Sequence, residues 1–223
     1  MKLLDSFFES LNSLITDTPG DLKVAGSAWS TRRPAAPVDM LVLDASGSMM
    51  EEDYRPTRLD GAKQAAIRFL EKRCAAAPDA CVGIVAFGDS AELVAAPLPV
   101  KAHLTELRAA IEGIALIGST NIAAGVNRAR QVIQSNPNRL APRIVLLTDG
   151  HSISGNPEAA AEKAKAAGVQ LDIIGIGGSP ADVDEDSLRR MASVVNGELR
   201  YWFIRSVGEL VRRFEFLGLR RTD

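Results

Sequence analysis

The order of apolar segments along this 223-residue chain predicts an α/β fold with a mainly parallel sheet and helices on both faces. Short β-compatible runs, such as residues 40–43 and 144–148, alternate with longer stretches whose apolar residues recur at helical spacing. Two of the short runs end in an acidic residue, Asp44 and Asp149. In an open parallel sheet, ligand-binding groups gather at the carboxyl ends of the strands, so both acids should lie at that edge.

The strands and helices follow one another from residue 39 to residue 217. We expect strands at residues 39–43, 81–87, 92–100, 144–148, 171–176 and 201–204. The third is predicted to be an antiparallel partner of the second, because only a Gly-Asp-Ser turn separates them. We expect helices at residues 58–76, 104–114, 122–134, 157–167, 186–195 and 207–217. Gly168 should end the fourth of these helices, and Asn196-Gly197 the fifth.

A separate segment precedes the predicted domain. Residues 2–16 carry a wide apolar stripe at helical spacing and predict an amphipathic helix, which packs on its own domain or docks on a partner. Residues 17–36 are rich in Pro, Gly, Ser and Thr and are typical of a linker. The chain therefore divides into an N-terminal helix and linker (1–36), one domain (37–217) and a short C-terminal tail (218–223).

Composition narrows the classes of function. The formal net charge is −2, which argues against nucleic acid as the main partner, because phosphate binding needs a concentrated basic surface. No apolar stretch is long enough to span a bilayer, and Asp5 and Glu9 interrupt what would be the core of a signal peptide. We therefore expect a cytoplasmic protein. In that compartment Cys74 and Cys81 should be reduced thiols, although a disulfide between them is geometrically possible.

Oxygen donors are concentrated in three of the predicted loops. Asp44, Ser46 and Ser48 project from the loop after the first strand, Thr120 lies in a Gly-Ser-Thr-Asn loop, and Asp149 ends a later strand. Carboxylates and hydroxyls are hard ligands, of the kind that Mg²⁺, Mn²⁺ or Ca²⁺ prefer. Asp44 and Ser46 alone could equally be turn or cap residues. That alternative explains less well why Ser48 repeats the hydroxyl and why Thr120 and Asp149 fall at matching positions.

These residues resemble the metal-ion-dependent adhesion site (MIDAS) of the von Willebrand factor A domain family, also called the integrin I-like type. The family motif reads Asp-x-Ser-x-Ser, then a distant Thr and a distant Asp, and Asp44, Ser46, Ser48, Thr120 and Asp149 match it in order. The resemblance covers about residues 37–217. It implies a doubly wound, six-stranded sheet of order 3-2-1-4-5-6 with strand 3 antiparallel.

The resemblance also implies how the site works. Ser46 and Ser48 would bind Mg²⁺ directly, and Asp44, Thr120 and Asp149 would bind it directly or through water. Mn²⁺ or Ca²⁺ could take its place. An open coordination position would then accept an Asp or Glu carboxylate from a protein partner.

Other residues are candidates for the rim of that site. Met49, Asn121 and His151 neighbour the motif residues and could contact a partner. Each has an alternative: Met49 could pack under the loop, Asn121 could cap the next helix, and His151 could be an exposed loop residue. Four arginines near the C-terminus predict a solvated face or, alternatively, a docking patch for acidic groups: Arg212, Arg213, Arg220 and Arg221.

The sequence favours a non-enzymatic interaction module of a bacterial, intracellular type. Relatives of that type work beside AAA+ ATPases such as MoxR, or in stress-response complexes. The alternatives are a metal-dependent hydrolase or phosphatase of Rossmann-like fold and an extracellular adhesin. A haloacid-dehalogenase-type phosphatase would need an acid where Ser46 stands, and the chain has no P-loop motif and no evident nucleophile with a paired base.

Overall fold

The structure is a computed structural model that describes residues 35–136 and 139–220. These residues belong to one compact unit that begins at Ala35. The predicted helix at residues 2–16 lies outside the described residues. Cys74 and Cys81 are not joined to each other by a disulfide. Over the part of the chain that is described, no helix is both long enough and apolar enough to cross a membrane.

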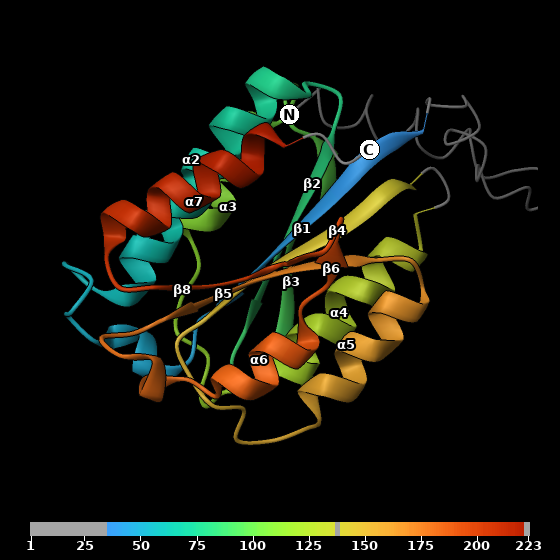
Figure 1. Cartoon of the computed structure of the whole chain (residues 1–223). Helices are drawn as coiled ribbons and strands as arrows, with labels where there is room; N and C mark the ends of the chain where they lie inside the picture. The colour runs from blue at the N-terminus through green and yellow to red at the C-terminus, as the bar shows by residue number, and fades with distance from the viewer. Residues whose placement is uncertain (1–34, 137–138, 221–223) are drawn as a thin grey trace, which may run out of the picture. The chain divides into compact units, whose positions relative to one another are not determined.

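A six-stranded sheet forms the centre of the unit, in the order β3-β2-β1-β4-β5-β8 (Figure 1). Neighbouring strands are parallel except for β3, which is antiparallel to β2. The predicted strand order and the antiparallel third strand are therefore confirmed. The strands are β1 (Ala36–Asp44), β2 (Cys81–Phe87), β3 (Ala91–Pro99), β4 (Arg139–Thr148), β5 (Gln170–Ile176) and β8 (Tyr201–Ile204).

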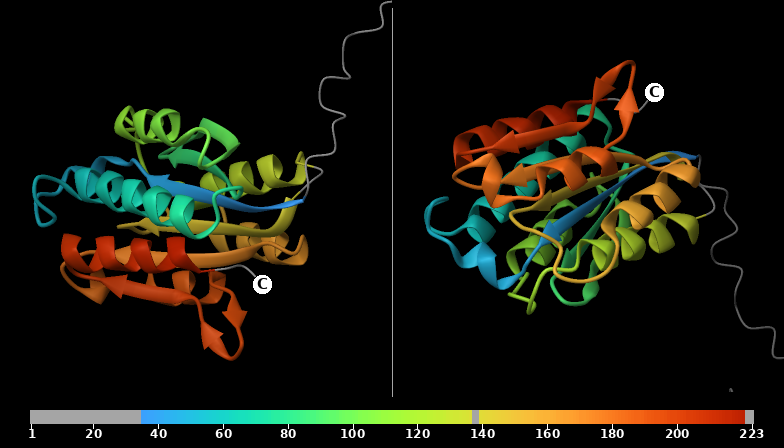
Figure 2. Two further views of the ribbon diagram at one scale, coloured as in Figure 1. Left: turned by 90° about the horizontal axis from the view of Figure 1, so that it is seen from above. Right: turned by 60° about the horizontal axis from the view of Figure 1, so that its bottom comes forward.

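Helices cover both faces of the sheet (Figures 1 and 2). One core layer lies under α2 (Arg58–Ala76), α3 (Leu104–Glu112) and α7 (Val207–Leu219), and it includes Phe69, Ile111 and Phe214. The opposite layer lies under α4 (Ile122–Gln134), α5 (Pro157–Ala166) and α6 (Glu185–Met191). The described part of the chain therefore forms three layers, with the sheet in the middle.

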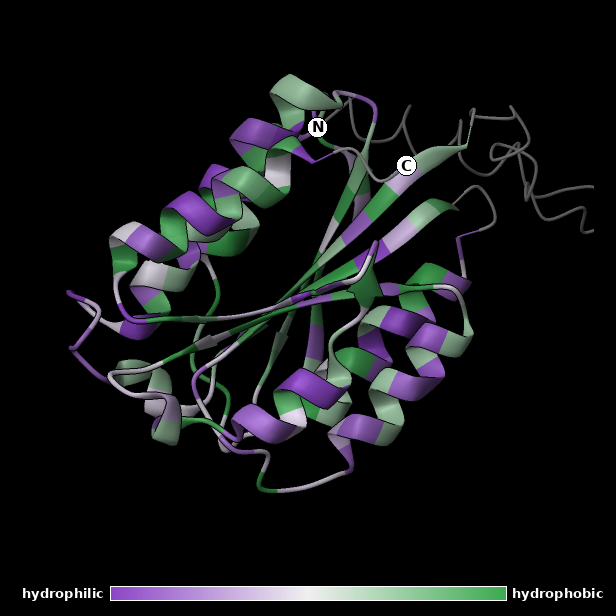
Figure 3. Ribbon diagram, viewed as in Figure 1, coloured by the Kyte–Doolittle hydropathy of each residue, from purple (hydrophilic) through white to green (hydrophobic). Residues whose placement is uncertain are grey.

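Strand β1 shows how burial on both faces follows from the sequence. Leu41 and Leu43 belong to the core layer under α2, whereas Met40 and Val42 belong to the layer under α4. Successive side chains of a strand point to opposite faces, so a strand covered on both sides is apolar throughout rather than alternating. The central strands are accordingly mainly hydrophobic, with a few charged residues such as Asp39 in β1 and Arg143 in β4, whereas the helices carry polar residues on their outer sides (Figure 3).

One predicted helix is wrong at its C-terminal end. The sequence predicts a helix over residues 186–195, but α6 ends at Met191 and a small hairpin follows it. In that hairpin β6 (Val194–Val195) pairs with β7 (Glu198–Leu199). Asn196 and Gly197 have φ angles of +52° and +80°, so the pair forms the hairpin turn instead of a helix stop. Helix α7 also runs two residues past the predicted domain end at residue 217.

Candidate metal site

Three loops at the carboxyl end of the sheet, which carry Asp44, Thr120 and Asp149, are joined by backbone hydrogen bonds. After β1, the N–H of Ala45 donates to the carbonyl of Phe87 at 2.7 Å, which fixes the loop against β2. The N–H of Ile117 donates to the carbonyl of Ala45 at 2.6 Å, and that of Gly47 donates to Gly118 at 3.0 Å. The short 3₁₀ helix η1 (Gly47–Met50) continues from there. Residues far apart in sequence are thus held beside each other.

Asp44 is the buried centre of this arrangement. Its Oδ1 accepts a hydrogen bond from the backbone N–H of Ser46 at 2.9 Å, and its Oδ2 accepts one from the Thr148 hydroxyl at 2.6 Å. The side chain has no exposed area. Burial raises the pKa of Asp44 to about 6, and the nearby Asp149 carboxylate adds to the increase. The positive charge around Asp44 is therefore too small to offset the cost of burying its ionised form.

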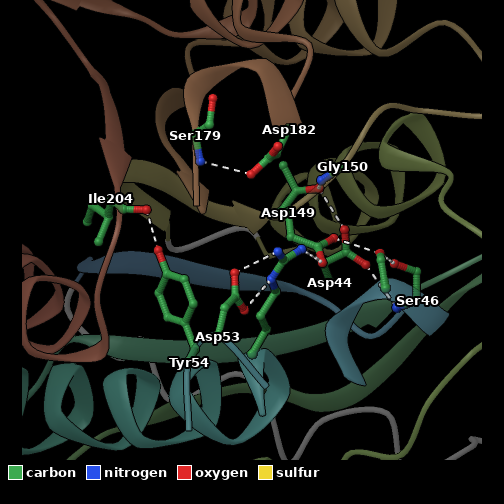
Figure 4. A network of polar contacts seen from close by, with 12 residues as sticks. Asp44, Ser46, Asp53, Tyr54, Asp149, Gly150, Ser179, Asp182 and Ile204 are labelled. Carbon is green, nitrogen blue, oxygen red and sulfur yellow. Dashed lines mark hydrogen bonds and ion pairs between the residues drawn. The ribbon is translucent and has the colours of Figure 1, made fainter. Parts of the chain in front are cut away.

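Asp149 lies beside Asp44 and is joined to the first loop (Figure 4). The hydroxyl of Ser48 donates to Oδ1 of Asp149 at 2.8 Å, and the hydroxyls of Ser46 and Ser48 are 3.2 Å apart. Asp149 and Ser46 are buried, whereas Ser48 is exposed. The donor set therefore reaches from the buried Asp44 to the surface, as a site open to a partner would require.

Arg58, the first residue of α2, supplies a cation that the motif does not contain. Its Nη1 donates to Oδ2 of Asp149 at 2.9 Å, and its Nε and Nη2 donate to the Asp53 carboxylate at 2.8 and 2.7 Å. These hydrogen bonds hold the pKa of Asp53 below its usual value. Sequence reasoning assigned Arg58 only to the start of a helix. The pair with Asp149 spans 91 residues, and no local pattern indicates it.

Thr120 lies on the loop between α3 and α4 and approaches the site from the side of Asp149. Its hydroxyl oxygen would be 3.8 Å from a Cβ placed on Gly150, and the residue is 5% exposed. The loop is anchored on both sides, because the Asn121 N–H donates to Gly88 O at 2.7 Å and the Ile153 N–H donates to Thr120 O at 2.9 Å. All five motif residues therefore lie on the three joined loops.

The three proposed rim residues differ in position. Met49 is fully buried in the core, so its assignment to the rim is wrong; Met50, its neighbour, is the exposed methionine. Apolar burial under the loop explains this, because η1 turns one of the two side chains inward. Asn121 caps α4 by accepting from the N–H of Ala124 at 2.9 Å. His151 is exposed beside the site.

The donor set fits a hard divalent cation. It consists of two carboxylates and three hydroxyls; Mg²⁺ is typically held by one or two carboxylates and completes its shell with water. Over the described residues, no group of three or more His, Cys, Asp or Glu side chains could hold a metal ion. Two neighbouring buried carboxylates with one arginine leave an excess of negative charge, which a divalent cation would neutralise.

The fold and the site together define an α/β domain with oxygen donors at the carboxyl edge of its sheet. The von Willebrand factor type A domain family matches residues 40–151, half of the chain. The protein therefore belongs to that family. The matched segment begins within β1 and contains all five motif residues, from Asp44 to Asp149.

Two bacterial relatives are similar in sequence. "Uncharacterized protein YfbK" of Escherichia coli (strain K12) is 29% identical over 206 residues, which cover 80% of this chain and 33% of that protein. A "UPF0353 protein" of Nocardia farcinica (strain IFM 10152) is 27% identical, over 97% of this chain and 76% of that protein. The chain thus spans about a third of the first relative's length and three quarters of the second's.

Solved structures share the fold. A von Willebrand factor type A protein from Catenulispora acidiphila superposes with a TM-score of 0.70 at 23% identity, over 83% of this chain and 42% of that one. The SpRpn10 VWA domain has a TM-score of 0.66 at 19% identity, over 80% and 95% of the two chains. BatB from Bacteroides thetaiotaomicron gives 0.66 at 18%, over 81% and 96%.

Proposed function

We propose that the protein is a divalent-metal-dependent protein-interaction module. Asp44, Ser46, Ser48, Thr120 and Asp149 would hold Mg²⁺, with Mn²⁺ or Ca²⁺ as substitutes, and the site would bind an Asp or Glu carboxylate of a protein partner. The observation that carries the proposal is the pair of neighbouring buried carboxylates, Asp44 and Asp149, surrounded by hydroxyls and one arginine. When bound, Mg²⁺ supplies a positive centre that accepts an anionic oxygen.

The chain's own residues orient the donors for that role. The Ser46 N–H and the Thr148 hydroxyl fix both oxygens of Asp44, so the carboxylate cannot rotate freely. Ser48 and Arg58 do the same for Asp149. Hydroxyl ligands add no negative charge. The two carboxylates formally balance Mg²⁺, but Arg58 already pairs with Asp149, so the ion, the two carboxylates and Arg58 together would keep a net positive charge, which favours an anionic partner group.

We further propose that the module is not an enzyme. In the described structure, the side chains that bond Asp44 and Asp149 include the hydroxyls of Ser48 and Thr148 and the guanidinium of Arg58. Ser48 and Thr148 donate to the two carboxylates that we assign to the metal, and neither hydroxyl is bonded to a histidine or lysine that would take its proton in nucleophilic catalysis. The purified protein is expected to hydrolyse neither nucleotides nor phosphate esters.

The cellular role we propose is that of a cytoplasmic subunit or adaptor of a bacterial complex. A complex built around an AAA+ ATPase of the MoxR type, or a stress-response system, is the partner class that the family resemblance favours. The two bacterial relatives support a bacterial setting for this architecture. Neither nucleic acid nor a membrane span is part of the proposal.

Titration calorimetry with Mg²⁺ and Mn²⁺ tests the metal. Asp44→Ala should weaken binding more than about 100-fold, which is about 3 kcal/mol, because it removes the buried carboxylate. Asp79→Ala, which removes an exposed loop acid, is the matched control and should bind as the wild type does. Equal affinity in Asp44→Ala and the wild type would disprove the site.

A pull-down from cell extract tests whether partner binding requires the metal. The partner should be retained in Mg²⁺, lost in EDTA, and lost with the Ser46→Ala protein. Ser135→Ala, at an exposed hydroxyl on the C-cap of α4, is the control. A partner that binds equally in EDTA and to Ser46→Ala would show that the metal, if bound, is not the recognition element.

A further inference from the structure

A second surface feature lies at the open edge of the sheet, away from the five motif residues. Strand β8 is the last strand and pairs only with β5 (Figure 2). A groove of about 670 Å³ runs along it, with β8 as its floor and α6 and α7 as its walls. We call it the edge groove; its defining residues are Glu185, Arg189, Trp202, Arg212, Arg213 and Phe216.

The floor of the edge groove presents main-chain groups that the sheet does not use. The carbonyl of Arg200 accepts from Ile173 of β5 at 2.8 Å, and that of Ile204 accepts from Gly177, the residue after β5, at 3.4 Å. Backbone groups alternate in direction along a strand, so those of Tyr201 and Phe203 face away from β5. No described strand pairs with that side. An edge of this kind can accept an added strand from another chain.

Arginines and aromatic rings from β8, α7 and the residues beside them alternate in one stack along the edge groove. The guanidinium of Arg213 lies 4.5 Å from the ring centre of Trp202 and 5.7 Å from that of Phe216. Arg200 lies 4.6 Å from the Trp202 ring, and Arg220 lies 5.4 Å from the Phe216 ring. The rings hold the guanidiniums in place, so the positive charges are preorganised before any ligand binds.

The positive charge in and beside the edge groove is only partly balanced by ion pairs. Arg189 pairs with Glu185 at 3.6 Å, and Arg200 pairs with Asp172 at 2.8 Å. Of the described acidic side chains, none lies within 4.0 Å of the guanidinium of Arg212 or Arg213. Burial and the neighbouring Arg200 and Arg220 lower the pKa of Arg213, and the negative charge of Asp172 opposes this only in part. An anionic group of a ligand would supply the negative charge that Arg212 and Arg213 lack.

We infer that the edge groove is a second docking surface, which binds an extended acidic segment of a partner protein. The segment would add to β8 by main-chain hydrogen bonds at Tyr201 and Phe203 and would place a carboxylate against Arg212 and Arg213. A peptide fits better than a nucleic acid. Glu185 and Glu209 also line the groove and would repel a continuous phosphate backbone, whereas a peptide main chain matches the open strand edge.

Selection from a displayed library of random eight-residue peptides on the full chain tests this inference, carried out in EDTA so that the metal site does not contribute. The selected peptides should be enriched in Asp and Glu alternating with β-branched residues. The best peptide, fluorescently labelled, should bind at least tenfold more weakly to Arg213→Gln and to Arg212→Gln. Arg128→Gln, which removes an exposed arginine from α4, is the matched control and should bind unchanged.

Hydrogen exchange then locates the peptide. Bound peptide should slow exchange of the Tyr201 and Phe203 amides and leave the loops at Asp44 and Asp149 unchanged. Selection of basic sequences, or of none, overturns the inference. So does a peptide whose affinity is equal in Arg213→Gln and Arg128→Gln, or tighter Arg213-dependent binding of a single-stranded oligonucleotide. Failure of metal binding in the tests above would not affect these outcomes.

Discussion

Arg58 is the residue that distinguishes this site from its motif, because it supplies the positive charge nearest to Asp149. The two side chains are nearly buried, with 11% and 0% of their areas exposed. Removing one partner of a buried ion pair typically costs about 3–5 kcal/mol, since the other charge is left without compensation. Arg58→Gln should therefore lower the free energy of unfolding by several kcal/mol in EDTA. Mg²⁺ should restore more stability to this variant than to the wild type.

Arg68→Gln is the matched control for that substitution. It lies on the same helix, and its ion pair with Glu71 is exposed, so it should cost less than about 1 kcal/mol. Chemical unfolding of the three proteins, with and without Mg²⁺, gives the comparison. If Mg²⁺ stabilised Arg58→Gln no more than it stabilised Arg68→Gln, then Arg58 would not share its site with the ion.

The raised pKa of Asp44 predicts a pH dependence of the metal effect. A carboxyl whose pKa rises from 3.8 to about 6 on folding stabilises the folded state below pH 3.8 and loses that contribution as the pH rises through about 6. The full shift is worth roughly 3 kcal/mol. Ionised Asp44 therefore destabilises the metal-free protein at neutral pH, and a divalent ion should remove that cost.

Thermal unfolding between pH 5 and pH 8 measures this effect. The increase in Tm caused by Mg²⁺ should be small at pH 5 and grow through pH 6 to a maximum near pH 7.5. Asp44→Asn cannot ionise at this position, and it should show neither the Mg²⁺ effect nor its pH dependence. An Mg²⁺ effect of constant size over this range would contradict the prediction.

At the scale of elements, the turn between β2 and β3 supports the loop that carries Thr120. A Cβ on Gly88 would lie 1.3 Å from the carbonyl oxygen of Ile117, so alanine cannot be accommodated without backbone movement. Gly88→Ala should cost about 3 kcal/mol of stability, the upper part of the range for overpacking. Because the displaced loop includes Thr120, the affinity for Mg²⁺ should fall as well.

Gly168→Ala is the control that separates the loss of stability in Gly88→Ala from its loss of affinity for Mg²⁺. Gly168 has a φ of +75°, and a Cβ added there would meet nothing within 4 Å, so alanine costs roughly 1–2 kcal/mol from backbone strain alone. It lies after α5, outside the three loops of the site. Its Mg²⁺ affinity by calorimetry should equal that of the wild type. Wild-type affinity in folded Gly88→Ala would mean that the loop's position does not affect the metal.

Local signals explain which elements could be predicted. Helices α2 and α4 begin where they were predicted, after the capping residues Thr57 and Asn121, whose side chains accept from backbone N–H groups. The hairpin after α6 was missed because Asn-Gly is compatible with a helix end and with a hairpin turn. Only the pairing of Val194 with Leu199 decides between them, and that contact is not encoded in the turn residues.

Contacts between residues far apart in sequence also limited what could be predicted about the site. Asp44, Ser46 and Ser48 were identifiable because three donors lie within five residues, and Asp149 because a strand ends there. Arg58 and Thr148 were not identified as part of the site. Their contacts with Asp149 and Asp44 span 91 and 104 residues and depend on how α2 and β4 pack beside β1. Sequence spacing alone contains no information about such pairs.

At the scale of the whole domain, the two ends of the sheet carry opposite charge excesses. The carboxyl end holds Asp44 and Asp149. Near the amino ends of the strands, buried charges alternate across the sheet in the order Arg73, Asp39, Arg143, Asp172 and Arg200. Two of these arginines also bond the end of α7: Arg143 donates to Leu217 O at 3.1 Å, and Arg73 donates to Arg220 O at 2.6 Å. Cations at a helix C-terminus are favourable.

Asp39 joins two arginines of this buried row, Arg73 and Arg143. Its Oδ1 accepts from Nε of Arg143 at 2.7 Å, and its Oδ2 lies 2.7 Å from Nε of Arg73 in an ion pair that is not aligned as a hydrogen bond. Asp39→Asn leaves two buried guanidiniums without their shared carboxylate and should cost about 3–5 kcal/mol. Urea unfolding should show this loss, whereas Asp79→Asn, at an exposed loop acid, should stay within about 0.5 kcal/mol of the wild type.

The metal site should not respond to this substitution, because Asp39 and Asp44 lie toward opposite ends of β1. Calorimetry under conditions where Asp39→Asn remains folded should therefore give the wild-type affinity for Mg²⁺. Stability lost without loss of affinity would mean that the charged row holds the layers together while the loops alone form the site. A fall in affinity that parallels the loss of stability would instead show that the two ends of the sheet are coupled, with the contacts of Arg73 and Arg143 to α7 as the connection to examine.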